Sequence, residues 1–187
     1  MKAAYVLYDN LTLLDFVGLY DPLSRLQSLG HLPDFTWDLC GVTPQIRDNF
    51  GLQITVDRVL PDLGSYDLVF VPGGFGTREL QHDPTFMDWL KTAEQVPLKA
   101  SVCTGSLLLG AAGFLTGCKA TTHFNEYAAL RPYCGEVIEE EIIVDDGGVI
   151  TAGAVASSLP LGLYLCNKFV GPERTEKIRM SMAYDAG

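Results

Sequence analysis

Cys103 lies in the segment Ala-Ser-Val-Cys-Thr-Gly-Ser, where an apolar run ends and a polar step follows. A thiolate is a strong nucleophile, and a cysteine between a strand and a helix lies at the positive end of the helix dipole. We expect this position to lower the pKa of Cys103 and to lift its sulfur out of the sheet, as in a nucleophile elbow. Gly105 and Ser106 would let the helix begin close to the strand. Alternatively, Cys103 is a buried structural cysteine.

A cysteine nucleophile needs a second group that takes up and returns protons. Asp15 is one candidate, because a carboxylate among apolar neighbours is costly to bury without a partner. If a helix begins near Thr12, Asp15 falls in its first turn, where a charge favoured by the helix dipole is the alternative. His123 is the other candidate, with a packed structural histidine as the alternative. Arg78 and Glu79 could reach a pocket mouth but are expected to be surface residues.

Two turns follow apolar runs that are typical of buried strands: Pro-Gly-Gly at 72–74 and the turn at Cys103. Ligands of open α/β sheets bind beyond the carboxyl ends of strands, where such loops meet. We therefore expect the backbone N–H groups of Gly74 and Thr104 to point at an oxyanion or another developing anion. Gly73 is expected to line the same pocket.

Short apolar runs alternate with longer amphipathic ones, which is typical of a parallel sheet covered by helices on both faces. Strands are expected at 2–8, 35–42, 53–57, 66–74, 99–102 and 119–124. The strand at 53–57 belongs to a hairpin, and a second hairpin over 140–152 turns at Asp146-Gly147-Gly148. Helices are expected after Cys103 and at 13–30, 83–95, 126–133, 154–170 and 173–183. Pro22 is expected to break or kink the first of these helices.

Composition and charge narrow the class of protein. The 187 residues suffice for one domain with a hydrophobic core, and no repeat or linker divides them. The net charge of −10 argues against nucleic acid as a partner, since a nucleic-acid-binding protein presents a basic face. The sequence has neither a signal peptide nor an apolar run of about 18 residues. We therefore expect a cytoplasmic protein that does not enter the membrane.

The five cysteines are scattered and include no Cys-x-x-Cys pair. A disulfide framework or a structural zinc site is therefore not expected, and a reducing compartment is favoured. Four of them lie in strand-like or helix-like runs or beside a turn, without the flanking residues of Cys103, and are expected to be structural: Cys40, Cys118, Cys134 and Cys166.

Three separated segments resemble the ThiJ/PfpI superfamily: "TLLDFVGLYDPL", "VFVPGGFGTREL" and "SVCTGSLLLGAAGFLTGCKATTHF". The resemblance is to its isonitrile hydratase (cyclohexyl-isocyanide hydratase) branch and to the amidase-like domains of AraC-type regulators. It runs from the first strand to 177–185. It implies a flavodoxin-like three-layer sandwich and a single class I glutamine amidotransferase-like domain over 1–187. A homodimer with the site near its interface is also implied.

The resemblance also implies roles for particular residues. The family's reactive cysteine falls on Cys103, its acidic partner on Asp15, its backbone-donor glycine on Gly74, and the following donor on Thr104. A histidine that approaches the site in some branches falls on His123. In a hydratase of this kind, the Cys103 thiolate attacks the carbon of an isonitrile and Asp15 handles the protons. The product is an N-substituted formamide, and neither a metal nor an organic cofactor is needed.

The sequence departs from the family's patterns at two positions. The protease branch has a histidine where this sequence has Thr104, so peptidase activity is not expected. Pro160, in Gly-Ala-Val-Ala-Ser-Ser-Leu-Pro, replaces an aspartate of the hydratase-like branch, which affects one expected pocket wall. Because the sequence ends at Gly187 without the regulators' helix-turn-helix domain, a transcription factor is not expected.

Two other functions remain open. A glyoxalase-like lyase or deglycase would act on dicarbonyls, although that activity pairs the cysteine with a glutamate, and the shorter Asp15 favours the hydratase. A redox or stress-response dimer would sense through oxidation of Cys103, because oxidation selects an accessible thiolate of low pKa.

Overall fold

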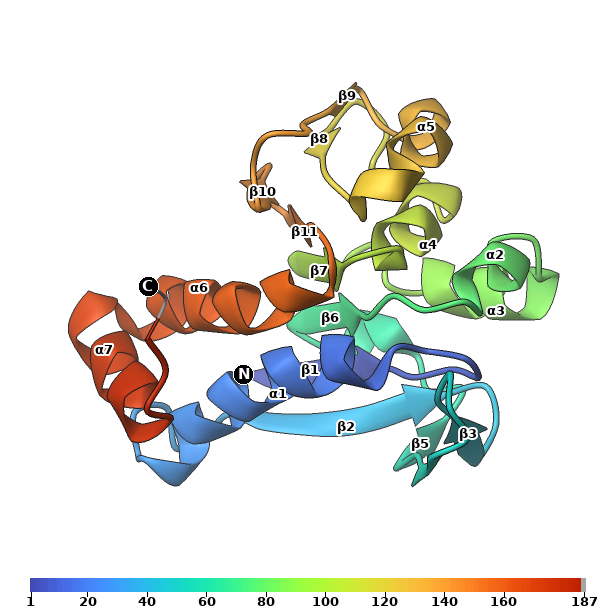
Figure 1. Ribbon diagram of the computed structural model, residues 1–187. Coiled ribbons are helices and arrows are strands. Elements are labelled where there is room, and N and C mark those ends of the chain that lie inside the picture. Colours follow the sequence, from blue (N-terminus) through green and yellow to red (C-terminus); the bar gives the residue numbers. More distant parts are fainter. Residues whose placement is uncertain (186–187) are drawn as a thin grey trace.

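A seven-stranded, mostly parallel sheet forms the centre of the computed structural model, which describes residues 1–185 (Figure 1). The strand order is β10-β11-β7-β6-β1-β2-β5, and β10 alone among these runs antiparallel to its neighbour. The strands are β1 (Lys2–Val6), β2 (Thr36–Gly41), β5 (Arg58–Val59), β6 (Leu68–Val71), β7 (Leu98–Val102), β10 (Ile143–Asp145) and β11 (Val149–Ala152). The expected flavodoxin-like sandwich is confirmed.

The direction of the chain crossovers explains why helices cover both faces of the sheet. From β1 to β2 the chain moves one way along the strand order, and from β6 to β7 to β11 it moves the other way. Because such crossovers are right-handed, the two directions place the connecting helices on opposite faces. The helices are α1 (Leu13–Ser28), α2 (Thr77–Leu80), α3 (Pro84–Lys91), α4 (Gly105–Ala111), α5 (Tyr127–Leu130), α6 (Ser158–Val170) and α7 (Pro172–Ser181).

The central strands form the core of the molecule. Every residue of β6, β7 and β11 is buried, as is typical of parallel strands covered on both faces. At the edges of the sheet the strands are shorter and partly exposed. The carboxyl ends of β1, β6 and β7 are therefore neighbouring positions on a rigid support, and the loops that leave them are held close together.

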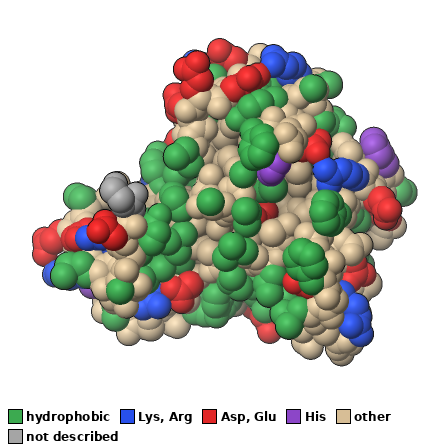
Figure 2. All heavy atoms as spheres, viewed as in Figure 1, with side chains coloured by type: hydrophobic (Ala, Val, Ile, Leu, Met, Phe, Trp, Pro, Cys, Tyr) green, Lys and Arg blue, Asp and Glu red, His purple; other side chains and the backbone are tan. Residues whose placement is uncertain are grey.

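Helices α1 and α6 pack closely against each other through small residues. A Cβ atom built on Gly18 would lie 2.1 Å from Ser158 Oγ, and one on Gly162 would lie 2.4 Å from Pro22 Cγ. Ser158 Oγ also donates a hydrogen bond to the carbonyl of Leu14 (3.2 Å). This packing fixes the first turn of α1 at the end of β1. Figure 2 shows hydrophobic side chains gathered across this face of the molecule.

Of the expected break or kink at Pro22, the break does not occur. Helix α1 is continuous from Leu13 to Ser28 with Pro22 inside it. The proline ring packs at Gly162 of α6, and the Pro22 carbonyl accepts a hydrogen bond from the Cys166 thiol (3.4 Å). These tertiary contacts offset the backbone hydrogen bond that proline cannot donate.

Both predicted hairpins are present. Strands β3 (Gln45–Arg47) and β4 (Gln53–Thr55) pair antiparallel around the Asp-Asn-Phe-Gly turn. Strands β10 and β11 pair around Asp146-Gly147-Gly148. The short helix α2 was not expected from the sequence.

The expected strand at 119–124 is wrong beyond its first two residues. Strand β8 covers only Lys119–Ala120 and pairs with β9 (Glu136–Val137) in a separate two-stranded sheet. Beyond it, Thr121 N donates to Thr151 Oγ1 (2.8 Å), and Thr122 Oγ1 donates to the Cys103 carbonyl (2.9 Å). Residues 121 and 122 therefore hydrogen-bond to a threonine side chain of β11 and to the turn after β7, instead of pairing with a neighbouring strand.

The remaining segments are short 3₁₀ turns: η1 (Leu63–Ser65), η2 (Phe124–Glu126), η3 (Arg131–Tyr133) and η4 (Val155–Ser157). The expected helix at 126–133 is thus divided among η2, α5 and η3, and that at 154–170 begins with η4. Within residues 1–185, none of the helices has the length and hydropathy needed to cross a membrane.

Candidate active site

Cys103 follows the last residue of β7 in a left-handed backbone conformation, with φ +54°. This conformation is uncommon for a residue with a side chain and is held only where surrounding contacts impose it. The Cys103 N–H lies near the carbonyls of Ala152 (3.1 Å) and Gly153 (2.7 Å). Its own carbonyl accepts hydrogen bonds from Ser106 Oγ (3.1 Å) and Thr122 Oγ1 (2.9 Å). The predicted sharp elbow is therefore present and is fixed from both sides.

Gly105 allows α4 to begin against the end of β6. A Cβ atom at this position would lie 2.2 Å from the Val71 carbonyl oxygen and 2.7 Å from that of Pro72. Only glycine permits this approach without displacing the backbone. The expectation that Gly105 brings the helix close to the sheet is confirmed.

Asp15 lies in the first turn of α1 and is fully buried. The Gly73 N–H donates to its Oδ2 (2.9 Å), while Oδ1 has no nitrogen or oxygen hydrogen-bond partner among residues 1–185. A Cβ atom on Gly73 would lie 2.8 Å from both Asp15 Oδ2 and Cys103 Cβ. The carboxyl and the cysteine therefore crowd the same backbone position, and the structure brings together the two residues predicted from separate segments.

Burial dominates the ionisation of this pair. It raises the pKa of Asp15 to about 7, although hydrogen bonds with the Gly73 N–H and the Cys103 thiol oppose the rise. Burial and the charge of Asp15 raise the pKa of Cys103 to about 12, against the hydrogen bonds of Thr104. The expected lowering of this pKa by the helix dipole is wrong, because the thiol is buried beside a carboxylate and α4 has only seven residues. The thiol is thus largely protonated near neutral pH.

The Gly74 N–H does not point freely into the pocket as expected. It donates to Thr104 Oγ1 (3.0 Å), and the same hydroxyl lies 3.2 Å from the Gly74 carbonyl. Gly74 has φ +143°, and a Cβ atom there would lie 2.4 Å from the Asn10 carbonyl oxygen. The backbone and hydroxyl of Thr104 both act to lower the pKa of Cys103. Thr104 therefore connects the two loops next to the sulfur.

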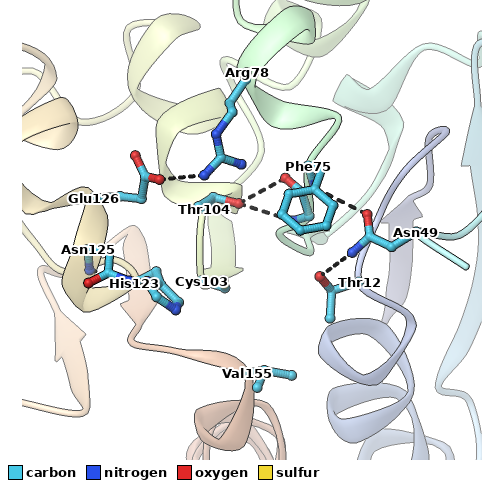
Figure 3. Close-up of a pocket in the computed structure, with 11 residues that line it drawn as sticks. Thr12, Asn49, Phe75, Arg78, Cys103, Thr104, His123, Asn125, Glu126 and Val155 are labelled. Carbon is cyan, nitrogen blue, oxygen red and sulfur yellow. Dashed lines mark hydrogen bonds and ion pairs between the residues drawn. The ribbon is translucent and has the colours of Figure 1, made fainter.

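Cys103 opens onto a cavity of about 310 Å³. The cavity is lined by Thr12, Asn49, Gly74, Phe75, Arg78, Cys103, Thr104, His123, Asn125, Glu126 and Val155. Figure 3 shows Cys103 between His123 on one side and Phe75, Asn49 and Thr12 on the other. Asp15 is not exposed to this cavity, so a ligand meets the sulfur first and the carboxyl lies behind it.

His123 contributes to the pocket wall but not from a strand. Its Nδ1 accepts a hydrogen bond from the Asn125 N–H (3.2 Å), and its ring stacks on Phe124 with 4.3 Å between centroids. A neutral His123 therefore carries its proton on Nε2. The predicted neighbourhood of His123 and the elbow is confirmed by their shared pocket.

Several residues of the wall were not expected from the sequence. Arg78 is exposed, as expected, and it also lines the pocket, where it pairs with Glu126 and lies over the Phe75 ring at 5.7 Å. Asn49 Nδ2 donates to Thr12 Oγ1 (3.0 Å), and Asn49 Oδ1 accepts from the Phe75 N–H (3.3 Å). These residues come from segments far apart in the chain, which no local pattern brings together.

Two other expectations concern the edges of this site. Pro160 lies within α6 and does not line the cavity, whereas Val155 of the same segment does. Glu79 lines a different, smaller hollow. Among residues 1–185 no three His, Cys, Asp or Glu side chains are grouped as metal ligands would be.

The other four cysteines lie away from this cavity. Cys40 and Cys166 are buried, and Cys118 and Cys134 are half-buried. Burial raises the pKa of all four thiols, to about 11 for Cys40 and about 12 for Cys166. Within the described residues Cys103 is the cysteine that combines a strained backbone, a buried carboxyl neighbour and an open pocket.

The chain is similar to known proteins over nearly its whole length. The DJ-1/PfpI family model matches residues 1–168. Isonitrile hydratase from Pseudomonas putida is 33% identical over 187 residues, which cover 98% of this chain and 78% of that protein. The HTH-type transcriptional regulator CdhR from Pseudomonas aeruginosa is 27% identical over 90% of this chain, which spans about half (51%) of the regulator's length.

Solved structures agree with the fold. A ThiJ/PfpI family protein from Pseudomonas syringae has a TM-score of 0.88 at 26% identity, covering all of this chain and 76% of that one. Drosophila melanogaster DJ-1beta has a TM-score of 0.84 at 19% identity, covering 98% of each chain. The latter likeness supports the fold alone.

Proposed function

This chain belongs to the DJ-1/PfpI family, and we propose that it is a cysteine-dependent enzyme that hydrates isonitriles to N-substituted formamides. The observation that carries the proposal is the fully buried Asp15 carboxyl against Cys103 at the floor of an open cavity. The similarity to an isonitrile hydratase supports the choice of substrate. The elevated pKa of Asp15, about 7, suits a group that both accepts and donates protons near neutral pH.

The reaction begins when the isonitrile carbon approaches Cys103 Sγ. The S–H proton passes to the Asp15 carboxylate as the S–C bond forms, so no free thiolate has to accumulate beforehand. Asp15 then gives its proton to the same carbon, which yields a thioimidate, R–N=CH–S–Cys103. Transfer between adjacent buried groups avoids exposing charge to the apolar surroundings.

Water completes the reaction. It adds to the thioimidate carbon while Asp15 accepts one of its protons, and Asp15 then passes this proton to the nitrogen. The C–S bond then breaks, the remaining hydroxyl proton returns to the sulfur, and the N-substituted formamide leaves. One isonitrile and one water give one formamide, and Cys103 and Asp15 return to their starting states. The Thr104 N–H and hydroxyl stabilise negative charge on the sulfur during bond formation and cleavage.

The walls of the cavity suit a small neutral substrate. Phe75 and Val155 offer apolar surface to the substituent on nitrogen. Arg78 is already paired with Glu126, so the two charges at this wall compensate each other. His123 presents Nε2–H as a donor to the substrate or to the attacking water.

A second candidate is a lyase acting on dicarbonyls, favoured by the presence of His123 in the same pocket as Cys103. The similarity to DJ-1 homologues keeps this reaction, and a redox role, as outcomes of the test. A redox sensor is less well supported, because the raised pKa of Cys103 disfavours the thiolate that peroxide attacks.

The test follows cyclohexyl isonitrile consumption and formamide production by chromatography. We expect turnover by the wild type, none by Cys103→Ala or Asp15→Asn, and a reduced rate for Thr104→Val. Cys118→Ser is the matched control, because this half-buried cysteine lies outside the pocket. Turnover that survives in Cys103→Ala would exclude the mechanism. If the wild type consumes methylglyoxal but no isonitrile, the lyase replaces the hydratase.

We also propose that residues 1–187 form a single domain and that the protein is a cytoplasmic homodimer. Its ligand is a small substrate rather than nucleic acid. Exposed apolar side chains on α1 and at the cavity support a second copy of this chain as the partner. Leu14 and Val17 of α1 are 56% and 37% exposed, and Phe75 at the cavity rim is 65% exposed. An apolar surface next to a pocket is typical of an interface that completes a site.

A further inference from the structure

Tyr8 is a buried polar residue that the proposed reaction does not use. It follows β1, is 1% exposed, and packs edge-to-face on Phe86 with 5.8 Å between ring centroids. Its hydroxyl donates to the Pro72 carbonyl at 2.5 Å. Burial and the charges of Asp15 and Cys103 raise the pKa of Tyr8 well above its ordinary value, so the hydroxyl stays a donor over the working pH range.

The acceptor of this hydrogen bond belongs to the peptide group that holds Asp15. The Pro72 carbonyl and the Gly73 N–H are parts of one planar unit, and the Gly73 N–H donates to Asp15 Oδ2 (2.9 Å). The described chain contains no cis peptide bond, so the two groups point in opposite directions from this unit. Tyr8 therefore holds one side of the peptide plane, and Asp15 is held by the other.

We propose that Tyr8 is a positioning residue that orients Asp15 toward Cys103 through the Pro72–Gly73 peptide. Its hydrogen bond fixes the rotation of the peptide plane and polarises the N–H that grips the carboxylate. Without it, the plane is free to tilt and the Gly73 N–H no longer points squarely at Oδ2. The inference rests on the proposed pairing of Cys103 with Asp15, but not on isonitrile as the substrate.

The surroundings of Tyr8 make this arrangement specific. Asp15 and Cys103 are the charged groups that act on Tyr8, and the Cys103 thiol is the side chain that acts on Asp15. Gly73 must remain without a side chain, because a Cβ there would collide with Asp15 and Cys103. A side chain at position 73 therefore cannot hold the Asp15 carboxyl in place of the backbone. The orientation of the carboxyl depends on the plane of the Pro72–Gly73 peptide.

Tyr5, within β1, provides a matched control. It is fully buried, like Tyr8, but its hydroxyl has no hydrogen-bond partner among residues 1–185. Removing either hydroxyl leaves an aromatic ring in the core. Only removal of the Tyr8 hydroxyl disturbs the peptide that holds Asp15, so a comparison of Tyr8→Phe with Tyr5→Phe isolates the positioning effect from general loss of a buried hydroxyl.

The experiment measures the rate of Cys103 alkylation by iodoacetamide against pH, with peptide mapping by mass spectrometry to separate Cys103 from the other cysteines. In the wild type the rate rises with a midpoint near the Asp15 pKa of about 7, because ionised Asp15 accepts the thiol proton as the sulfur attacks the reagent. In Tyr8→Phe we expect slower alkylation at neutral pH and a midpoint that is higher by about half a pH unit to one pH unit. The reason is that a weaker hydrogen bond from the Gly73 N–H stabilises the Asp15 carboxylate less. Tyr5→Phe is expected to match the wild type.

The readout needs no turnover, so failure of the hydratase proposal leaves it intact. In an Asp15→Asn background, Tyr8→Phe should cause no further change in the profile. The proposal is overturned if Tyr8→Phe and the wild type give the same midpoint, if Tyr5→Phe shifts it equally, or if the effect persists without Asp15. Should Tyr8→Phe not fold, 3-fluorotyrosine at this position alone keeps the hydroxyl and makes it a stronger donor. The midpoint is then expected to fall, and an unchanged midpoint overturns the proposal.

Discussion

Replacing Asp15 with asparagine is expected to stabilise the fold at neutral and alkaline pH while abolishing the reactivity of Cys103. The carboxyl is fully buried, and burial raises its pKa from 3.8 to about 7. Between these values the unfolded chain releases the proton and the folded chain keeps it. Stability therefore falls as the pH rises through this range, and the loss is complete above about pH 7.

The magnitude follows from the difference between the two pKa values. Each unit corresponds to about 1.4 kcal/mol, so ionised Asp15 makes the folded state less stable by about 4 kcal/mol. The asparagine amide of the variant would retain an oxygen that can accept the Gly73 N–H, but its NH2 group buries polar hydrogens without acceptors, at a cost of about 1 kcal/mol. We expect Asp15→Asn to be more stable than the wild type by about 3 kcal/mol at about pH 8, and slightly less stable at about pH 4.

Urea unfolding followed by circular dichroism at a series of pH values measures this effect. The difference between the wild-type and Asp15→Asn curves isolates Asp15 from other carboxyls, such as Asp38 and Asp145, whose pKa values are lowered by Lys2 and Lys168. An aspartate on the surface of α3, Asp88→Asn, serves as the control and should show no such trend. A variant that is less stable than the wild type at about pH 8, or a difference that does not change with pH, would refute the reasoning.

Two further predictions concern the backbone at the elbow and the assembly. Gly105→Ala places a Cβ atom 2.2 Å from the Val71 carbonyl oxygen and should destabilise the protein by about 1–3 kcal/mol in thermal unfolding. Gly148→Ala is the control, because its nearest contact is at 3.4 Å and it should cost little stability. Equal losses of stability in the two variants would contradict this prediction. Val17→Glu should convert a dimer to a monomer in sedimentation velocity, whereas Leu29→Glu at the other end of α1 should not; a monomeric wild type would argue against the dimer.

Much of the fold could be predicted from local pattern because strands and helices have different periodicities and their turns have particular residues. The buried strand β6 and the antiparallel pairs at both hairpins are examples. The exceptions are segments where tertiary contacts outweigh local preference. Pro22 is kept within α1 by its packing on α6, and Thr121 and Thr122 hydrogen-bond to β11 and to the turn after β7 instead of extending a strand.

The sequence by itself determined that Cys103 follows a strand at a sharp turn, that Asp15 lies in the first turn of a helix, and that a glycine turn lies between them in the chain. These features depend on neighbouring residues, so they can be read from one segment at a time. Only the tertiary structure decided how the site ionises and which side chains form its wall. Burial is a property of all the surrounding elements together, and it raises the pKa of Cys103 where the helix dipole alone would lower it. The ion pair of Arg78 and Glu126 joins positions 48 residues apart. The hydrogen bond from Tyr8 to the Pro72 carbonyl joins positions 64 residues apart. Only folding brings such positions into contact.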